Sequence, residues 1–110
     1  MLLLDLAGDA LRTFIEENDV VLVDVTATWC NPCKQLAPIL ESVSKKIEGI
    51  AHIVTINSEK ESAFCSQFLV RSVPTMIIFK NGDEAERING IANEEEIIAL
   101  LKSVAGEEKD

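Results

Sequence analysis

The chain has 110 residues, of which 47% are hydrophobic, and it carries a formal net charge of −9. This length and composition suit one globular domain over residues 1–110, with a core of its own and a frayed charged tail at 107–110. The strong negative charge disfavours nucleic acids and anionic membranes as partners, because both are polyanions.

Strand and helix patterns alternate over the first two thirds of the chain. Asp9 stands where it would cap a first helix, and Ser58 and Glu61 have the spacing of a capping box for a third. Such alternation favours parallel strands joined by right-handed crossovers. The expected elements are a strand or arm at 2–6, a helix from 8 to about 18, a strand at 20–25, a helix from about 30 to 48, a strand at 50–56 and a helix from 58 to about 68.

The final third of the chain predicts a hairpin followed by a helix. A strand at 76–79 and a strand at 84–88 are separated by Asn81-Gly82, a strong signal for a tight hairpin turn. Asn93 is expected to cap the last helix. Because a hairpin added to parallel strands makes the sheet mixed, we expect an α/β fold. Its central mixed β-sheet would have four to five strands, flanked by about four helices.

The segment 29–33, Trp-Cys-Asn-Pro-Cys, lies where a buried strand gives way to a helix. A helix N-terminus presents unpaired N–H groups and a partial positive charge, which favour a thiolate over a thiol. A Cys-x-x-Cys pair at such a place indicates redox chemistry. The chain has three cysteines, no basic leader and no stretch long enough to span a bilayer. These features indicate a cytoplasmic protein whose thiols are kept reduced.

Three further residues have more than one interpretation. Asp24 interrupts an apolar strand, and burial should raise its pKa towards neutrality. It is therefore either a proton acceptor for the second cysteine or a buried acid satisfied by backbone donors. Trp29 is either a core anchor or a flat apolar wall for a substrate. Cys65, on a helix with Phe64 and Phe68, is expected to be a small buried thiol.

Three blocks of the sequence carry a family resemblance. They are VLVDVTATWCNPCKQLAP at 21–38, RSVPTMIIFKNG at 71–82 and RINGIA at 87–92. In order and spacing they resemble the active-site segment, the cis-proline loop and the glycine segment of the thioredoxin family. The resemblance covers nearly the whole chain and implies a thioredoxin fold and a protein disulfide reductase.

The resemblance also implies roles for individual residues. Cys30 would be the exposed nucleophile and Cys33 the buried resolving thiol, the two forming a Cys30–Cys33 disulfide. Asp24 would exchange a proton beneath them, and Val73-Pro74 would be a cis peptide facing them. The expected substrate-contact residues are Trp29, Asn31, Pro32, Val73, Pro74, Gly90 and Ile91.

By the same resemblance, the protein would be a monomer with no bound cofactor or metal, acting on disulfide-containing protein substrates. Its electrons would come from NADPH through a thioredoxin reductase. Asn31 stands where the family usually has glycine, and Thr55 where many members have a lysine beside the buried acid. The dipeptide between the cysteines lacks the histidine of more oxidising relatives. We therefore expect a potential nearer to about −270 mV than to about −180 mV.

Two other functions are consistent with the sequence. A redox-inactive thioredoxin-fold adaptor would keep the fold without the chemistry. A structural zinc site would need four ligands, and the chain offers only Cys30, Cys33, Cys65 and His52, at long spacings.

Overall fold

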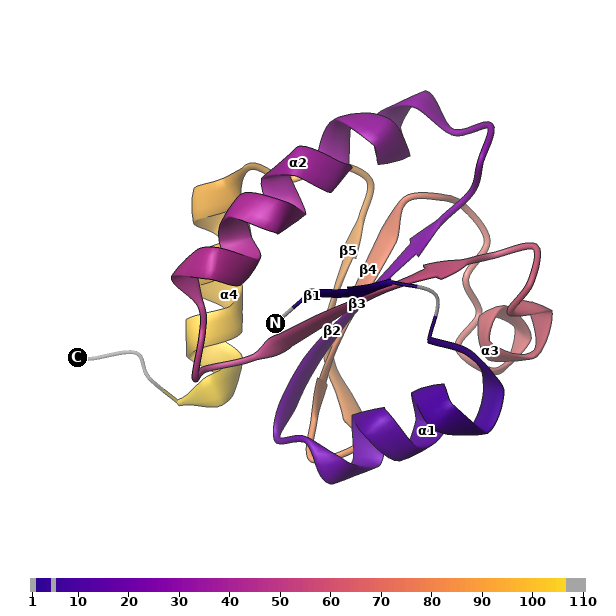
Figure 1. Ribbon diagram of the computed structural model, residues 1–110. Helices are drawn as coiled ribbons and strands as arrows, with labels where there is room; N and C mark the ends of the chain where they lie inside the picture. Colours follow the sequence, from indigo (N-terminus) through magenta and orange to yellow (C-terminus); the bar gives the residue numbers. More distant parts are fainter. Residues whose placement is uncertain (1, 5, 107–110) are drawn as a thin grey trace.

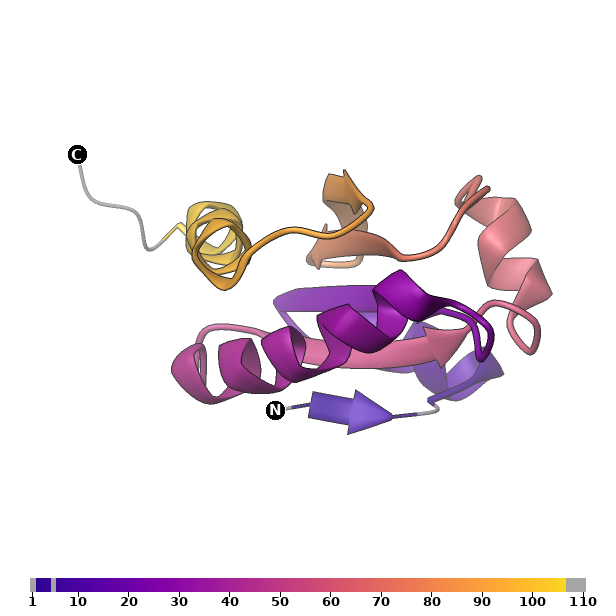
Figure 2. The same cartoon turned by 90° about the horizontal axis from the view of Figure 1, so that it is seen from above.

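The computed structural model describes residues 2–4 and 6–106 (Figure 1). The predicted tail at 107–110 lies outside this range. Within it, the strands are β1 Leu2–Leu4, β2 Val20–Thr26, β3 His52–Asn57, β4 Thr75–Lys80 and β5 Asp83–Asn89. They form one sheet in the order β1-β3-β2-β4-β5, which Figure 2 shows from one edge to the other. Strands β1, β3 and β2 are parallel to one another, β4 pairs antiparallel with β2, and β5 pairs antiparallel with β4. The predicted mixed sheet is therefore confirmed.

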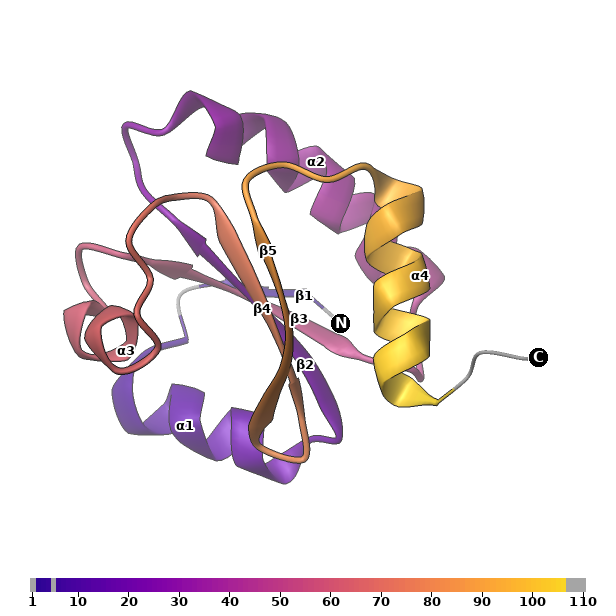
Figure 3. The same cartoon turned by 180° about the vertical axis from the view of Figure 1, so that it is seen from behind.

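The helices of the described residues cover both faces of this sheet. They are α1 Gly8–Glu17, α2 Asn31–Lys46, α3 Ser62–Gln67 and α4 Glu94–Ala105. Helices α2 and α4 lie together over one face, and α1 and α3 lie on the other (Figure 1 and Figure 3). None of these helices is long and apolar enough to cross a membrane.

The central strand β2 divides its side chains between two cores. Val21, Val23 and Val25 pack on the side of α1 and α3, whereas Val20 and Leu22 pack on the side of α2 and α4. Asp24 shares the second side, because alternate residues of a strand share a face. A strand covered by helices on both faces has no solvated side. The alternation therefore places a carboxyl group inside the protein, beside the first turns of α2.

The predicted cap of the first helix is wrong. Helix α1 begins at Gly8 with Ala7 as its extended N-cap, so Asp9 lies inside the first turn. The N–H of Gly8 donates to Glu61 Oε1 at 3.1 Å, a partner 53 residues away in the sequence. A capping partner at that distance leaves no trace in the local pattern.

The predicted capping box of the third helix is also wrong. Helix α3 begins at Ser62, and Glu61 is its N-cap without a side-chain hydrogen bond. The preceding residues form a turn instead, in which the N–H groups of Lys60 and Glu61 donate to the Asn57 carbonyl. The N–H groups that the Ser58 side chain would have capped belong to this turn. The helix therefore begins at Ser62 and is shorter than its sequence pattern predicts.

Two local signals in the final third are confirmed. Asn81 and Gly82 have positive φ angles of 51° and 89°, as the tight turn between β4 and β5 requires. The Asn93 side chain accepts a hydrogen bond from the Glu96 N–H, and the Glu96 carboxylate accepts one from the Asn93 N–H. This reciprocal capping box fixes where α4 begins after the chain leaves β5.

Candidate active site

The two cysteines lie at the N-terminus of α2 and form a disulfide. Cys30 is the N-cap of the helix, and its Sγ accepts a hydrogen bond from the Cys33 N–H at 3.1 Å. Pro32 lies in the first turn, where the N–H that proline lacks would have no partner within the helix. An N–H group and a helix N-terminus directed at a sulfur favour its thiolate over its thiol, and Cys30 Sγ has both.

Both cysteines are buried in this disulfide form, with 3% of Cys30 and 5% of Cys33 exposed. The predicted exposure of Cys30 is therefore wrong for the oxidised protein. The disulfide packs against Ala27 of its own segment and against Val73, a tertiary contact from the loop before β4. Asn31, which lies between the two cysteines in sequence, is exposed.

The loop before β4 supplies the other side of the site. The Val73-Pro74 peptide is cis, which confirms the expectation from the family resemblance. Val73 packs against the disulfide cluster, and the Pro74 carbonyl accepts a hydrogen bond from the Gly90 N–H at 2.8 Å. Gly90 has a φ of +95°, a conformation that favours glycine, and Ile91 beside it is 45% exposed. Three segments far apart in sequence thus meet at the disulfide end of the sheet.

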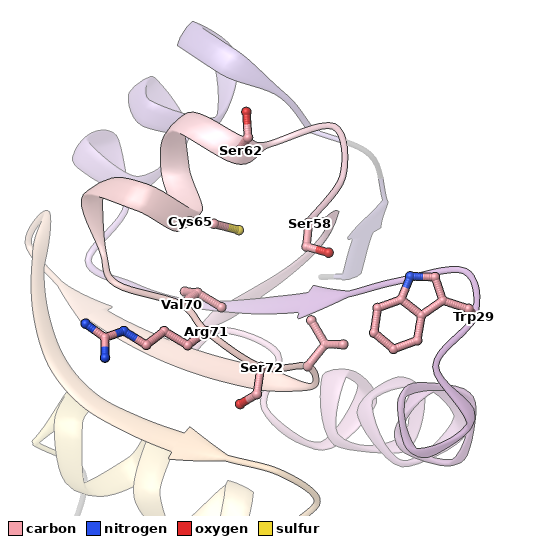
Figure 4. Close-up of a pocket in the computed structure, with 8 residues that line it drawn as sticks. Trp29, Ser58, Ser62, Cys65, Val70, Arg71 and Ser72 are labelled. Carbon is pink, nitrogen blue, oxygen red and sulfur yellow. The ribbon is translucent and has the colours of Figure 1, made fainter.

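A hollow of about 280 Å³ lies beside Trp29 and Val73 (Figure 4). Trp29 is 70% exposed, which excludes the core-anchor interpretation of this residue. Cys65 was expected to be buried, but it is half-buried and its sulfur lines the hollow. Phe64 takes the core position of α3 instead. The rest of the wall was missed from sequence, because it combines separate segments: Ser58, Ser62, Val70, Arg71 and Ser72.

Asp24 lies on the face of the sheet that α2 covers, and it lines a cavity together with Cys33. It is 3% exposed, and within the described residues its Oδ1 has no hydrogen-bond partner. Burial raises its pKa from 3.8 to about 7, because no neighbouring charge or donor offsets the loss of water. The interpretation as an acid satisfied by backbone donors therefore does not hold for Oδ1. The strand register places Thr55 opposite Asp24, as expected from the sequence.

Asp24 and Cys33 line the same cavity, which has a volume of about 410 Å³. A proton acceptor must lie within reach of the group that it serves, directly or through one water, and the shared cavity meets this condition for Asp24 and Cys33. Cys30 does not line this cavity, so the two cysteines have different surroundings.

His52 lies outside this arrangement. It contacts the Phe14 ring edge-on, with ring centroids 5.4 Å apart, and burial lowers its pKa. Across residues 2–4 and 6–106, no group of three or more His, Cys, Asp or Glu side chains is arranged to hold a metal ion.

Comparisons with known proteins decide the family. The thioredoxin family model matches residues 3–103. The chain belongs to the thioredoxin family. A thioredoxin-like protein of Synechocystis sp. is 38% identical over 82 residues, which make up 74% of this chain and 78% of that protein. A thioredoxin of Staphylococcus aureus is 36% identical over 85 residues, 77% of this chain and 82% of that protein.

Solved thioredoxins share the fold. A mutant thioredoxin from Halobacterium salinarum gives a TM-score of 0.87 at 31% identity, covering 94% of this chain and 90% of that chain. The oxidised thioredoxin from Plasmodium falciparum gives a TM-score of 0.82 at 27% identity, and the match covers 96% of this chain and 99% of that chain. The family and the Cys30–Cys33 disulfide together make this chain a thiol–disulfide oxidoreductase that exchanges a dithiol for a disulfide.

Proposed function

We propose that the protein reduces disulfides of other proteins, with Cys30 as the nucleophile, Cys33 as the resolving thiol and Asp24 as the proton acceptor and donor. The observation that carries this assignment is the different environment of the two cysteines. Cys30 is the N-cap of α2, whereas Cys33 lines a partly open cavity together with Asp24, whose Oδ1 has no hydrogen-bond partner within the described residues.

The reaction has two exchange steps. In the first, the Cys30 thiolate attacks one sulfur of the target disulfide, whose S–S bond breaks while a mixed disulfide forms. The departing target thiolate takes a proton from solvent. In the second, Cys33 gives its proton to the Asp24 carboxylate and attacks Cys30 Sγ. The mixed disulfide breaks, the second target sulfur leaves as a thiolate that is protonated, and the Cys30–Cys33 disulfide forms. The target gains two electrons and two protons. The protein loses the two electrons, the proton that left Cys30 when its thiolate formed, and the Cys33 proton when Asp24 releases it.

Asp24 suits this role because its pKa of about 7 lies near the operating pH. A carboxyl that is half ionised at neutral pH can accept the Cys33 proton and later release it. Asp24→Asn would remove the acceptor while keeping the shape of the side chain. We expect slower release of the mixed disulfide at neutral pH in single-turnover experiments. An unchanged rate would remove Asp24 from the mechanism.

We propose that an extended segment of the target lies across the exposed surface around the disulfide. Val73, which precedes the cis peptide bond and packs against the disulfide, would offer its backbone to an added strand. Exposed apolar side chains on either side, Trp29 and Ile91, would hold the target segment. The proposed contact residues are Trp29, Asn31, Pro32, Val73, Pro74, Gly90 and Ile91.

We further propose that residues 1–110 act as one independent domain and as a monomer in the cytoplasm, where a thioredoxin reductase returns electrons from NADPH. A reducing compartment suits a pair that must be recharged after each turnover. Equilibration with glutathione would measure the potential, which we expect nearer to about −270 mV than to about −180 mV. A value as oxidising as the second would contradict the proposed direction of electron flow.

Insulin reduction in the presence of dithiothreitol tests the main assignment. Cys30→Ser should abolish activity, while Cys33→Ser should accumulate a mixed disulfide with the target, visible on a non-reducing gel. Cys65→Ser is the matched control, because it removes the one thiol of the chain outside the disulfide. If the protein were an adaptor without redox chemistry, the wild-type protein itself would not reduce insulin. Activity that persists in Cys30→Ser would exclude Cys30 as the nucleophile.

A further inference from the structure

The cavity beside Asp24 has the features of a small-ligand site. It has a volume of about 410 Å³ and is partly open to solvent, so a small molecule can enter it. One of its walls carries a carboxyl group that is almost fully buried and whose Oδ1 has no hydrogen-bond partner within the described residues. An ionised carboxylate in that position costs free energy until a cation or a donor meets it.

The chemistry of the walls indicates which cation would fit. Asp24 and Thr26 lie on one face of β2, and the register places Thr55 of β3 opposite Asp24 on the same face. Together they offer a carboxylate and two hydroxyl groups, which suits the three N–H donors of a primary ammonium group. The facing wall is apolar and includes Leu40 and Pro38 of α2. An ammonium on a short alkyl chain matches both walls.

The rim of the cavity carries one charge of each sign, from Lys34 and Glu41. Both side chains are exposed, and the only cause of the Asp24 pKa shift is burial, so Lys34 does not act as the partner of Asp24. The net charge of −9 gives the whole protein a preference for cations. A bound metal ion fits less well, because the described residues hold no group of three acidic, His or Cys ligands.

We propose that this cavity binds a small primary alkylammonium ion, whose N–H groups donate to the Asp24 carboxylate while its alkyl chain lies against the wall formed by α2. The cavity has no lining residue in common with the hollow beside Trp29 and Val73. Cys33 lines this cavity, but none of the residues proposed to contact the target does, so the ligand is a free amine rather than a side chain of the target. The site does not depend on the proposed catalytic role of Asp24, and it is tested by binding rather than by activity.

The test is calorimetric titration of the oxidised protein with n-butylammonium chloride at about pH 8.5, where Asp24 is ionised and an alkylamine is still protonated. Tetramethylammonium chloride, which has charge but no N–H, and n-butanol, which has no charge, are the matched probes. We expect saturable binding of butylammonium in the millimolar range and none of either control. Equal binding of tetramethylammonium, or no saturable binding of butylammonium, would overturn the proposal.

Variants locate the site. Asp24→Asn removes the charge and Thr55→Lys places a tethered ammonium in the cavity, so each should weaken butylammonium binding by about tenfold or more. Glu48→Gln removes an exposed charge elsewhere and should leave binding unchanged. Undiminished binding in Asp24→Asn would refute the site. A parallel titration with N-acetyl-lysine amide separates two sources of the ammonium group, a free amine and a lysine side chain of a protein. Preference for butylammonium supports a free amine, and comparable binding of the lysine amide would overturn that choice.

Discussion

The raised pKa of Asp24 predicts that this residue destabilises the folded protein, and that the effect depends on pH. Below about pH 4 the carboxyl is largely protonated in both the folded and the unfolded chain, so it contributes little. Between about pH 4 and pH 7 the unfolded chain ionises Asp24 while the folded chain keeps it protonated, so stability falls as pH rises. Above the folded pKa of about 7 both states are ionised, and the full penalty is present.

The magnitude follows from the two pKa values. Each pKa unit corresponds to about 1.4 kcal/mol, so the interval from 3.8 to about 7 corresponds to a penalty of about 4 kcal/mol above neutrality. Asp24→Asn removes the ionisation and keeps a side chain of nearly the same size. The free energy of unfolding of the variant, relative to wild type, should therefore rise by about 4 kcal/mol between pH 4 and pH 8.5.

Urea unfolding of the oxidised proteins at several pH values measures this difference, because urea is uncharged and does not screen the carboxylate. The change with pH is the diagnostic quantity, since the amide that replaces the carboxyl in the variant has its own constant cost of burial. Glu48→Gln, which removes an exposed carboxyl, should give a curve parallel to wild type. If the Asp24→Asn curve is also parallel to wild type, the burial of Asp24 does not impose this penalty on the folded protein.

Other contacts predict further outcomes. Asn93→Ala removes the cap of α4 and should lower the free energy of unfolding by about 1 kcal/mol in urea. Leu36→Ala opens a cavity in the fully buried core under α2 and should cost about 2–5 kcal/mol by the same assay. Trp29→Ala should change stability by less than about 0.5 kcal/mol, because the side chain is 70% exposed. The same variant should lower kcat/KM for insulin reduction by about tenfold, and an unchanged kcat/KM would remove Trp29 from the substrate surface.

The elements of this fold were predictable where the signal is local. The hairpin turn at Asn81-Gly82 and the helix cap at Asn93 depend on residues within three positions of one another, and both are confirmed. The cap of α1 and the start of α3 were predicted wrongly for the opposite reason, although α1 does begin at residue 8 as expected. The N–H of Gly8 is met by Glu61, and the turn at Asn57 displaces the helix that the spacing of Ser58 and Glu61 predicts.

The sequence by itself determined the reaction class, because the Trp-Cys-Asn-Pro-Cys segment at the end of a buried strand places two thiols at a helix N-terminus. It also placed Asp24 in the core, because one acid in an apolar strand follows the alternation of that strand into the protein. Only the tertiary structure decided how each group is surrounded. It brings Val73 from the loop before β4 against the disulfide, and it leaves Asp24 Oδ1 facing a cavity with no hydrogen-bond partner within the described residues. Burial and pairing are sums over contacts from distant segments, which no local pattern contains.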